Sequence, residues 1–289
     1  MSKIRKAIVA VAGSGTRLLP VTKAMPKEML PIIDKPIIQL VVEELVEAGI
    51  TDIILVTKWD KKPLEDHFDQ NLSLLNDLKK AGKDALSEDI ERIANLANFI
   101  FIRQKPQYGN GVPVLSAANL VENEPFVFCF GDDLVRSKTS FTKSMVEEYE
   151  RIGKPIMAVQ EVPTEEVSRY GIVELAEGSN RIGRIVEKPS PEETASRLAD
   201  FGRMVLNQEI IDELKDTPLG KSGELWLIDA IERHIQKGGE VYAKKVEEGE
   251  WLTTGDPWNY LKANLKYAMD REDLKDDLVA FCRKNICLD

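Results

Sequence analysis

The chain alternates between short apolar runs and longer stretches in which apolar residues recur at helical spacing. Residues 6–12 (KAIVAVA) and 52–57 (DIILVT) are rich in β-branched residues and almost continuously apolar, as is typical of strands buried on both faces of a parallel sheet. Between them, residues 36–48 (PIIQLVVEELVEA) have helical spacing, with Pro36 at the start and Gly49 just past the end. This order predicts the opening of a doubly wound α/β sheet.

The same alternation continues to the end of the chain. Further strands are expected at residues 99–103, 125–130, 155–162, 170–175, 182–186, 202–206 and 241–246. Helices are expected at 61–68, 141–153, 225–236, 258–269 and from near Arg271 onward, with one or two surface helices within 71–97. No repeat or linker divides the chain, so we expect one domain over 1–289.

Composition narrows the function classes. The 289 residues include 39 basic and 49 acidic residues, giving a net charge of −10, with 43% hydrophobic and 30% charged residues. These values predict a globular protein and argue against a nucleic-acid partner, which needs a basic surface. Three cysteines are too few for a disulfide scaffold. Because no apolar segment has the length of a signal peptide or a membrane span, we expect a cytoplasmic protein with no membrane partner.

A glycine-rich turn follows the first predicted strand. In Gly13-Ser14-Gly15-Thr16-Arg17, the glycines would let backbone N–H groups approach a phosphate closely. Arg17 and Lys27 add positive charge to a segment stiffened by prolines. A bare G-x-G is more often an ordinary turn, and the sequence lacks the third glycine of a dinucleotide-binding loop. The complete string with both cations predicts a phosphate site.

Two later segments carry candidate chemistry. Asp132 and Asp133 follow a predicted buried strand, at the end where doubly wound sheets bind ligands, and could hold Mg²⁺. The alternative is that they only open a turn. Glu187-Lys188-Pro189 combines a possible phosphate-binding cation with a carboxylate that can accept hydrogen bonds from sugar hydroxyls, and alone would be a surface pair. His67 and His234 are expected to be surface or packing residues.

Residues 12–39 (AGSGTRLLPVTKAMPKEMLPIIDKPIIQ) resemble the signature of the sugar-1-phosphate nucleotidyltransferases, most closely the bacterial UTP–glucose-1-phosphate uridylyltransferases. The resemblance continues in order along most of the chain, through several further motifs. They are residues 104–111 (QKPQYGNG), 131–134 (GDDL), 169–173 (RYGIV), 186–189 (VEKP), 202–203 (GR), and 223–224 (GE) to 229–230 (DA). The helical segment at 71–97 is also similar to the uridylyltransferase branch, and less so to the shorter thymidylyltransferases.

The resemblance implies a Rossmann-like nucleotidyltransferase fold with a mostly parallel central sheet, a small β-rich sugar-binding part and C-terminal helices. Residues 1–135 would mainly bind nucleotide, 155–260 mainly sugar, and 261–289 would form the helices. The implied reaction makes UDP-glucose and pyrophosphate from UTP and glucose 1-phosphate with Mg²⁺, in a homodimer or homotetramer. The implied catalytic residues are Arg17, Lys27, Asp132 and Lys188, with Asp132 as the metal ligand. The implied nucleotide-binding residues are Ala12, Gly13, Gly15, Thr16, Gln104 and Gly109, and the implied sugar-binding residues are Gly171, Glu187 and Glu224.

The chain departs from the family pattern at several points. Val112-Pro113 replaces a usual His-Ala, Thr253 stands where an acidic residue near the metal is usual, Trp226 replaces a usual Gln, and Asp200-Phe201 replaces an apolar pair. Pro113 removes a backbone donor, and a hydroxyl is a poorer Mg²⁺ ligand than a carboxylate. Alternatives therefore remain: a thymidylyltransferase or another sugar preference, or a catalytically weakened homologue that binds nucleotide sugar.

Overall fold

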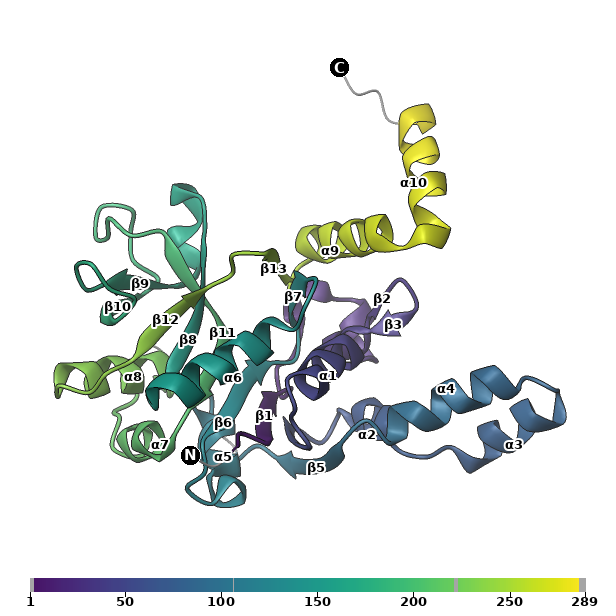
Figure 1. The fold of residues 1–289 in the computed structure, drawn as a ribbon, viewed down its shortest axis with the longest axis horizontal. Coiled ribbons are helices and arrows are strands. Elements are labelled where there is room, and N and C mark those ends of the chain that lie inside the picture. Colours follow the sequence, from purple (N-terminus) through teal and green to yellow (C-terminus); the bar gives the residue numbers. More distant parts are fainter. Residues whose placement is uncertain (1–2, 106, 221–222, 286–289) are drawn as a thin grey trace.

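A nine-stranded mixed sheet forms the centre of the computed structural model, which describes residues 3–105, 107–220 and 223–285 (Figure 1). The strand order is β10-β9-β11-β6-β1-β4-β5, and β8 pairs with β11 and β12. The strands are β1 Lys6–Ala10, β4 Asp52–Thr57, β5 Asn98–Arg103, β6 Phe126–Phe130, β8 Ile156–Glu161, β9 Gly171–Leu175, β10 Ile182–Glu187, β11 Leu198–Leu206 and β12 Tyr242–Lys245.

The predicted parallel arrangement is confirmed in the first half of the chain. Strands β5, β4, β1 and β6 all run parallel, and their residues are almost fully buried in β1, β4 and β6. Strand β11 pairs antiparallel with β6. Strand β9 pairs with β11 on its other side and antiparallel with β10, and both lie where strands were predicted at 170–175 and 182–186. The second half of the chain thus forms the smaller, β-rich part.

Helices cover both faces of the sheet. α1, α6 and α9 pack on one face with Val9 and Leu55, and α5, α7 and α8 pack on the other with Ile8 and Ile54. The helices are α1 Ile37–Glu47, α2 Lys62–Phe68, α3 Leu72–Lys80, α4 Asp84–Ala94, α5 Val112–Val121, α6 Phe141–Ile152, α7 Gln208–Lys215, α8 Leu227–Gln236, α9 Pro257–Asp270 and α10 Glu272–Asn285. Alternate residues of each central strand therefore serve two different cores.

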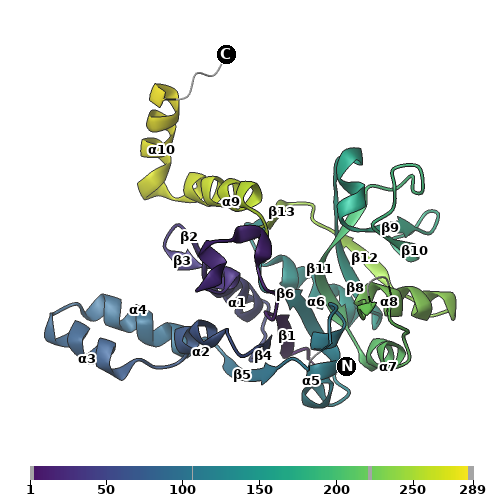
Figure 2. The ribbon, with the colours of Figure 1, turned by 180° about the vertical axis from the view of Figure 1, so that it is seen from behind.

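Two appendages leave this three-layer body (Figures 1 and 2). The predicted surface insertion consists of two helices, α3 and α4, which pack together and project as an arm beyond β5. The C-terminal helices α9 and α10 lie on the other side of α1 from this arm, and α10 turns away from the body. The predicted C-terminal helix is described as far as Asn285, and residues 286–289 lie outside the described residues. No helix in the described ranges has the length and apolarity to cross a membrane.

Several elements were not expected from the sequence. They are α5, α7, the two-stranded sheet of β7 (Asp133–Ser137) and β13 (Gly249–Thr253), and the short pair β2 (Pro31–Ile32) and β3 (Lys35–Pro36). The concern about Pro113 is answered by α5, because Pro113 lies in the first turn of that helix, where its missing N–H is not needed. The helix predicted from Leu225 begins at Leu227.

Candidate active site

The carboxyl ends of the parallel strands meet at one edge of the sheet. Ala10 of β1 pairs with Val56 of β4 and with Phe130 of β6, and Thr57 of β4 pairs with Arg103 of β5. The glycine turn, Lys58, Gln104 and Asp132 directly follow these strand ends. The topology therefore places the predicted nucleotide-side residues at one edge, where open α/β sheets bind ligands.

The glycine turn lies against Lys27. A Cβ atom added to Gly13 would lie 3.4 Å from Lys27 Cε, and one added to Gly15 would lie 3.1 Å from the methyl group of Thr22. Gly15 has φ 63°, and its carbonyl accepts a hydrogen bond of 2.8 Å from Thr22 Oγ1. Gly15 is therefore required both by its left-handed backbone and by the close approach of Thr22.

Lys27 binds Asp132 directly, although the two residues are far apart in sequence. The distance from Lys27 Nζ to Asp132 Oδ2 is 2.5 Å, and the two side chains are 19% and 13% exposed. Burial by itself lowers the pKa of Lys27, but the carboxylates of Asp132 and Glu28 outweigh burial and raise it. Lys27 is thus a fixed positive charge beside the glycine turn.

A second, deeper ion pair supports this one. Lys61 Nζ lies 2.7 Å from Glu28 Oε2, and both side chains are almost completely buried. Burial raises the pKa of Glu28 and lowers the pKa of Lys61, so each group depends on the other to stay charged. Gly131 packs closely against the side chains beside this ion pair. A Cβ added to Gly131 would lie 2.5 Å from Val11 and 3.3 Å from Glu28, so a larger residue would not fit.

Asp132 and Asp133 point to different partners. Asp132 lies in a turn after β6, whereas Asp133 begins β7 and its Oδ1 accepts a hydrogen bond of 2.9 Å from Trp251 Nε1. Burial, and then the charge of Asp132, raise the pKa of Asp133 to about 7. Asp133 is therefore held by the protein, and Asp132 is the carboxylate of this pair that faces Lys27.

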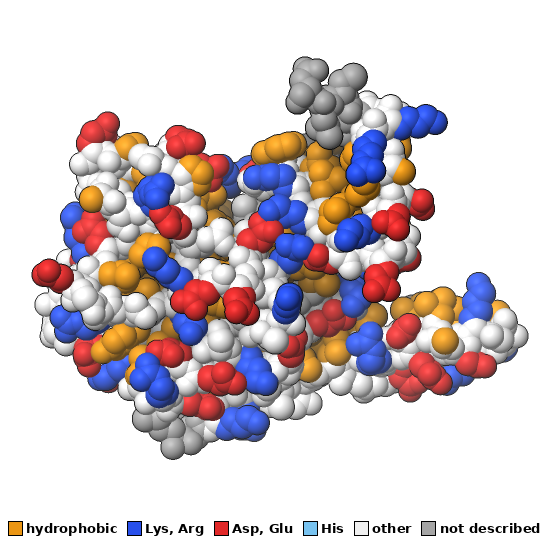
Figure 3. All heavy atoms as spheres, turned by 45° about the horizontal axis from the view of Figure 1, so that its top comes forward, with side chains coloured by type: hydrophobic (Ala, Val, Ile, Leu, Met, Phe, Trp, Pro, Cys, Tyr) orange, Lys and Arg blue, Asp and Glu red, His pale blue; other side chains and the backbone are white. Residues whose placement is uncertain are grey.

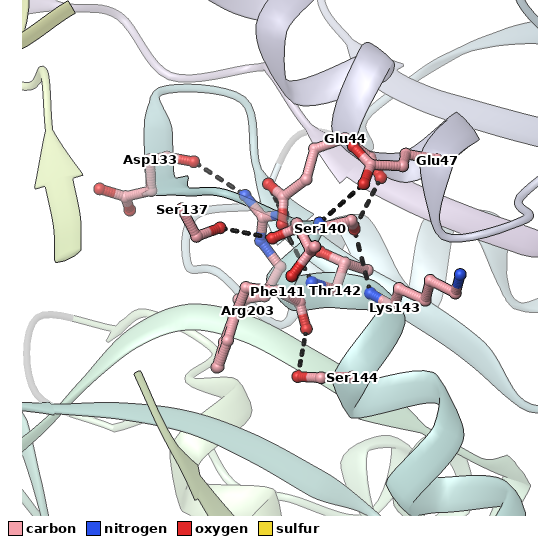
Figure 4. Close-up of polar contacts among 11 residues, drawn as sticks. Glu44, Glu47, Asp133, Ser137, Ser140, Phe141, Thr142, Lys143, Ser144 and Arg203 are labelled. Atoms are coloured by element: carbon pink, nitrogen blue, oxygen red, sulfur yellow. Dashed lines mark hydrogen bonds and ion pairs between the residues drawn. The ribbon is translucent and has the colours of Figure 1, made fainter. Parts of the chain in front are cut away.

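The buried guanidinium of Arg203 fixes the backbone of this segment (Figure 4). Arg203 Nη2 donates a hydrogen bond of 2.9 Å to the carbonyl of Asp133, while Nη1 contacts Glu44 at 2.5 Å and Thr142 Oγ1 at 2.7 Å. Arg203 is fully buried on β11, and its partners come from α1, α6 and β7. Arg203 thus joins α1, α6 and β7 to β11, next to the turn that carries Asp132.

Thr253, which stands where an acidic residue is usual in the family, pairs with Asp133 across β13 and β7, and its side chain hydrogen-bonds to Asp133. A Cβ added to Gly255 would be 3.6 Å from both Asp132 Oδ2 and Thr253 Oγ1. Thr254 Oγ1 donates a hydrogen bond of 2.8 Å to the carbonyl of Asp132. Among the residues that the structure describes, no three His, Cys, Asp or Glu side chains form a group able to hold a metal ion. The carboxylate of Asp132 contacts Lys27 at this point.

Two further cations lie at the glycine turn or next to it. Arg17 follows the glycine turn, in the short helix Thr16–Leu18, with an exposed side chain. Lys58 was not singled out from the sequence, yet its Nζ donates a hydrogen bond of 3.0 Å to Ser14 Oγ, within the glycine turn. Lys58 directly follows the strand that ends at Thr57, and a lone lysine in that place carries no local signal of its own.

The residues predicted to bind the base lie on neighbouring loops. The N–H of Gln104 donates to the carbonyl of Thr57, and its side-chain amide donates to the carbonyl of Gln107 at 3.0 Å. Gly109 has φ 119°, and an added Cβ would be 2.1 Å from the carbonyl oxygen of Leu225. Gly109 is thus required for the packing of its own loop on Leu225. Ala12 is half-buried directly before Gly13.

Of the residues predicted on the sugar side, Gly171, Glu187 and Lys188 lie together. Gly171 and Glu187 pair across β9 and β10, and a Cβ added to Gly171 would lie 3.2 Å from Glu187 Oε2. Lys188 has φ 48°, and its Nζ lies 3.1 Å from Glu187 Oε1 and 4.7 Å from the centre of the Trp226 ring. Glu224 is half-buried, and its carbonyl accepts a hydrogen bond of 2.8 Å from the N–H of Gly220.

Two more carboxyl groups belong to this region. Burial, and then the charge of Glu187, raise the pKa of Asp229, in the first turn of α8. Burial also raises the pKa of Asp200 to about 7, although a hydrogen bond from the N–H of Gly202 opposes the shift. Asp200 lies on β11 at a departure from the family pattern, and its pKa is further raised by Glu187.

The metal side and the sugar side are connected through aromatic residues. Trp251 donates to Asp133, and its ring packs edge-on against Tyr170 with ring centres 5.0 Å apart. The carbonyl of Tyr170 accepts a hydrogen bond of 3.0 Å from the N–H of Lys188. Two segments that the sequence could only predict separately are thus parts of one continuous packed unit.

The histidines take the packing roles that were expected. His67 Nε2 lies 3.1 Å from Gln39 Oε1, and the His234 ring packs against Gly239, whose added Cβ would lie 2.2 Å from Nε2. Cys129 is fully buried on β6, and burial raises the pKa of its thiol to about 12. None of these three side chains provides a nucleophile or a metal ligand at the site.

Comparisons with known proteins agree with this geometry. The family model described as nucleotidyl transferase matches residues 6–270. The chain is 43% identical over 287 residues to UTP–glucose-1-phosphate uridylyltransferase 2 of Staphylococcus saprophyticus, covering 98% of this chain and 99% of the relative. It is 43% identical over 284 residues to UTP–glucose-1-phosphate uridylyltransferase of Bacillus subtilis, covering 97% of both chains.

Two solved structures have the same fold over nearly their whole length. A UDP-glucose pyrophosphorylase complexed with UDP-glucose has a TM-score of 0.81 and 37% identity, over 93% of this chain and all of the other. A UTP-bound enzyme of this kind from Acinetobacter baumannii has a TM-score of 0.89 and 34% identity, over 98% and 99% of the two chains. The chain therefore belongs to the nucleotidyl transferase family and, within it, to the group of bacterial UTP–glucose-1-phosphate uridylyltransferases.

Proposed function

We propose that this chain transfers a uridylyl group from UTP to glucose 1-phosphate and releases UDP-glucose and pyrophosphate. The single observation that carries the proposal is the contact of 2.5 Å between Lys27 and Asp132 beneath the glycine turn. It brings a cation, a carboxylate and exposed backbone N–H groups to one strand edge, as transfer between two polyanions requires. The relatives named above carry the same activity in their names.

The reaction needs no covalent intermediate with the protein. A phosphate oxygen of glucose 1-phosphate forms a bond to the α-phosphorus of UTP, while the bond from that phosphorus to the α–β bridging oxygen breaks. Pyrophosphate leaves with the electron pair of that bond. The site fits this chemistry because its charged groups are lysines, an arginine and a carboxylate, and because the buried thiol of Cys129 stays protonated.

Residue roles follow from position. Arg17, Lys27 and the turn of Gly13, Gly15 and Thr16 would bind the triphosphate, where arginine can contact two phosphate oxygens at once. Lys188 would bind the phosphate of glucose 1-phosphate. Gln104 would pair with the uracil edge beside Ala12 and Gly109, and Gly171, Glu187 and Glu224 would line the glucose side. The nucleotide would thus occupy mainly the segment 1–135 and the sugar mainly 155–260.

Mg²⁺ is the proposed cofactor, with Asp132 as its protein ligand. Mg²⁺ in proteins commonly binds one or two carboxylates together with substrate phosphates and water, so a single available carboxylate fits this ion. Asp133 is held by Trp251, and Thr253 offers a hydroxyl rather than a second carboxylate. When bound, Mg²⁺ would neutralise charge on the phosphate oxygens.

Pyrophosphate release with a panel of four nucleoside triphosphates and several sugar 1-phosphates tests the proposal. We expect the highest kcat/KM with UTP and glucose 1-phosphate. A preference for dTTP would instead identify a thymidylyltransferase. Thr253 favours a second candidate, a weakened homologue that binds nucleotide sugar. Absence of release with every pair, together with measurable binding of UDP-glucose, would establish that candidate and overturn the first.

We infer that the protein works in the cytoplasm as a homodimer or homotetramer, with α9 in its interface. An apolar stripe on α9 supports this, because Trp258, Leu261, Leu265 and Met269 are spaced by three or four residues and are all more than one-third exposed. Hydrophobic side chains gather beside the C-terminal helices (Figure 3). The net charge of −10 gives no support to a nucleic-acid partner.

A further inference from the structure

Trp226 replaces a residue that is usually Gln in the family, and it lies on Lys188. The Lys188 ammonium is 4.7 Å from the centre of the Trp226 ring, within the range of a cation–π interaction. Lys188 is itself about half exposed, at 49% of its side-chain area. A lysine side chain with that freedom would ordinarily sample many rotamers, so a contact that restricts it matters for binding.

Two other contacts and an unusual backbone angle restrict Lys188. Its backbone has φ 48°, and its N–H donates to the carbonyl of Tyr170 at 3.0 Å. Its Nζ lies 3.1 Å from Glu187 Oε1. The backbone is therefore held in the left-handed region by its hydrogen bond to Tyr170, and the head group lies between a carboxylate and an aromatic face.

Trp226 is itself held in place. It directly precedes α8, it packs against the apolar core on that face of the sheet, and a Cβ added to Gly220 would lie 2.7 Å from its Cδ1 atom. Gly220 thus allows close approach of the indole. The N–H of the next residue, Leu227, donates to Asn110 Oδ1 at 2.8 Å, which joins the start of α8 to the loop of Gly109.

We propose that Trp226 is a positioning residue, which holds the ammonium of Lys188 in place to receive the phosphate of the sugar 1-phosphate. This inference rests on the proposed function for the identity of that substrate. The aromatic face attracts the ammonium without adding a second negative charge to that of Glu187, so the ammonium can still bind a phosphate. The pre-formed orientation reduces the entropy lost on binding, which affects affinity for the sugar 1-phosphate more than affinity for UTP.

The test compares Trp226→Phe with Trp226→Leu. Phenylalanine keeps an aromatic face, whereas leucine fills the space without one. We expect the KM for glucose 1-phosphate to rise by less than about twofold in W226F and by roughly five- to tenfold in W226L, with the KM for UTP and kcat within about twofold of wild type. Leu72→Ala is the control, because it removes an exposed apolar side chain from α3, far from Lys188 in the fold.

A double-mutant cycle shows whether Trp226 acts through Lys188. In a Lys188→Met background, W226L should add less than about twofold to the KM for glucose 1-phosphate. Equal effects of W226L with and without Lys188, or equal effects of W226F and W226L, would overturn the inference while leaving the uridylyltransferase function intact.

A spectroscopic measurement decides the same question without turnover. The Lys188 ε-methylene protons should be shifted upfield by the ring current in wild type and W226F, and the shift should vanish in W226L. Wild-type protein without this shift would overturn the positioning role even if the enzyme were active. Failure of UTP and glucose 1-phosphate to react, with the shift present, would instead contradict the proposed function alone.

Discussion

At the scale of single residues, the site depends on charges whose partners come from distant parts of the chain. Lys27 and Asp132 were both identified from local motifs, but their direct contact could not be predicted, because it depends on the packing of the loops after β1 and β6. Lys58 was missed for the same reason, since a lone lysine after a strand carries no local signal. Gly109 was predicted to leave room for the base; in the structure a side chain there would also collide with Leu225, a constraint that the local sequence does not show.

Replacement of Asp132 by Asn should reduce kcat by two or more orders of magnitude, because an amide binds Mg²⁺ poorly and leaves Lys27 without its anionic partner. Pyrophosphate release measures this effect. The circular dichroism spectrum should stay that of the wild type, and Asp89→Asn, which removes an exposed carboxylate from α4, is the control. Near wild-type turnover in D132N would show that the metal ligand lies elsewhere.

Asp200 makes stability depend on pH. Its pKa is raised to about 7 in the folded chain from an ordinary value of 3.8, so the folded state holds a proton that the unfolded state has lost. The stability from this group is complete below about pH 3.8 and is lost as the pH rises through about 7. Asp200→Asn, which keeps an acceptor for the N–H of Gly202, should therefore stabilise the protein more at pH 8.5 than at pH 5.5.

The expected difference between the two pH values is about 1–2 kcal/mol, measured by urea unfolding. Asp212→Asn is the control, because the pKa of the exposed Asp212 is lowered by a hydrogen bond from Lys215 and that variant should gain no stability at high pH. A gain in D200N that is the same at both pH values would contradict a protonated Asp200.

At the scale of elements, sequence pattern was most reliable where one strand or helix buries an uninterrupted apolar face. Strands β1, β4 and β6 and helices α1 and α6 were placed within a few residues, because apolar period and capping residues act locally. The pairing of β7 with β13 was missed because it joins residues more than a hundred positions apart. Helix α5 was missed because Pro113 suggests a stiff loop unless its place in a first turn is known.

Arg203 joins elements that the sequence could not connect. Arg203→Met should destabilise the fold by about 3–5 kcal/mol, because it leaves Glu44 without its cation and removes the donor to the carbonyl of Asp133. Chemical unfolding measures the loss. Arg197→Ala removes an exposed pair with Glu161 and should cost at most about 1 kcal/mol. Equal losses in the two variants would show that the Arg203 network is not structural.

At the scale of the whole molecule, composition and motif order indicated the α/β class and the family, whereas assembly left no clear pattern in the sequence. Leu265→Asp on α9 should weaken the proposed homo-oligomer and lower its mass in size-exclusion chromatography with light scattering, because it places a charge within the apolar stripe. Leu74→Asp, at a similarly exposed site on α3, is the control. A monomeric wild-type protein would contradict the inference.

The ion pair between Lys27 and Asp132 has a consequence for the empty protein. The ammonium of Lys27 and the carboxylate of Asp132 already contact each other at the strand edge, so their charges offset each other before any substrate binds. Binding of the nucleotide must then replace the contact between Lys27 and Asp132 with contacts to the nucleotide. The nucleotide does not enter a site whose own charges repel one another. Chelation by EDTA should accordingly abolish turnover while leaving the melting curve of the ligand-free protein unchanged.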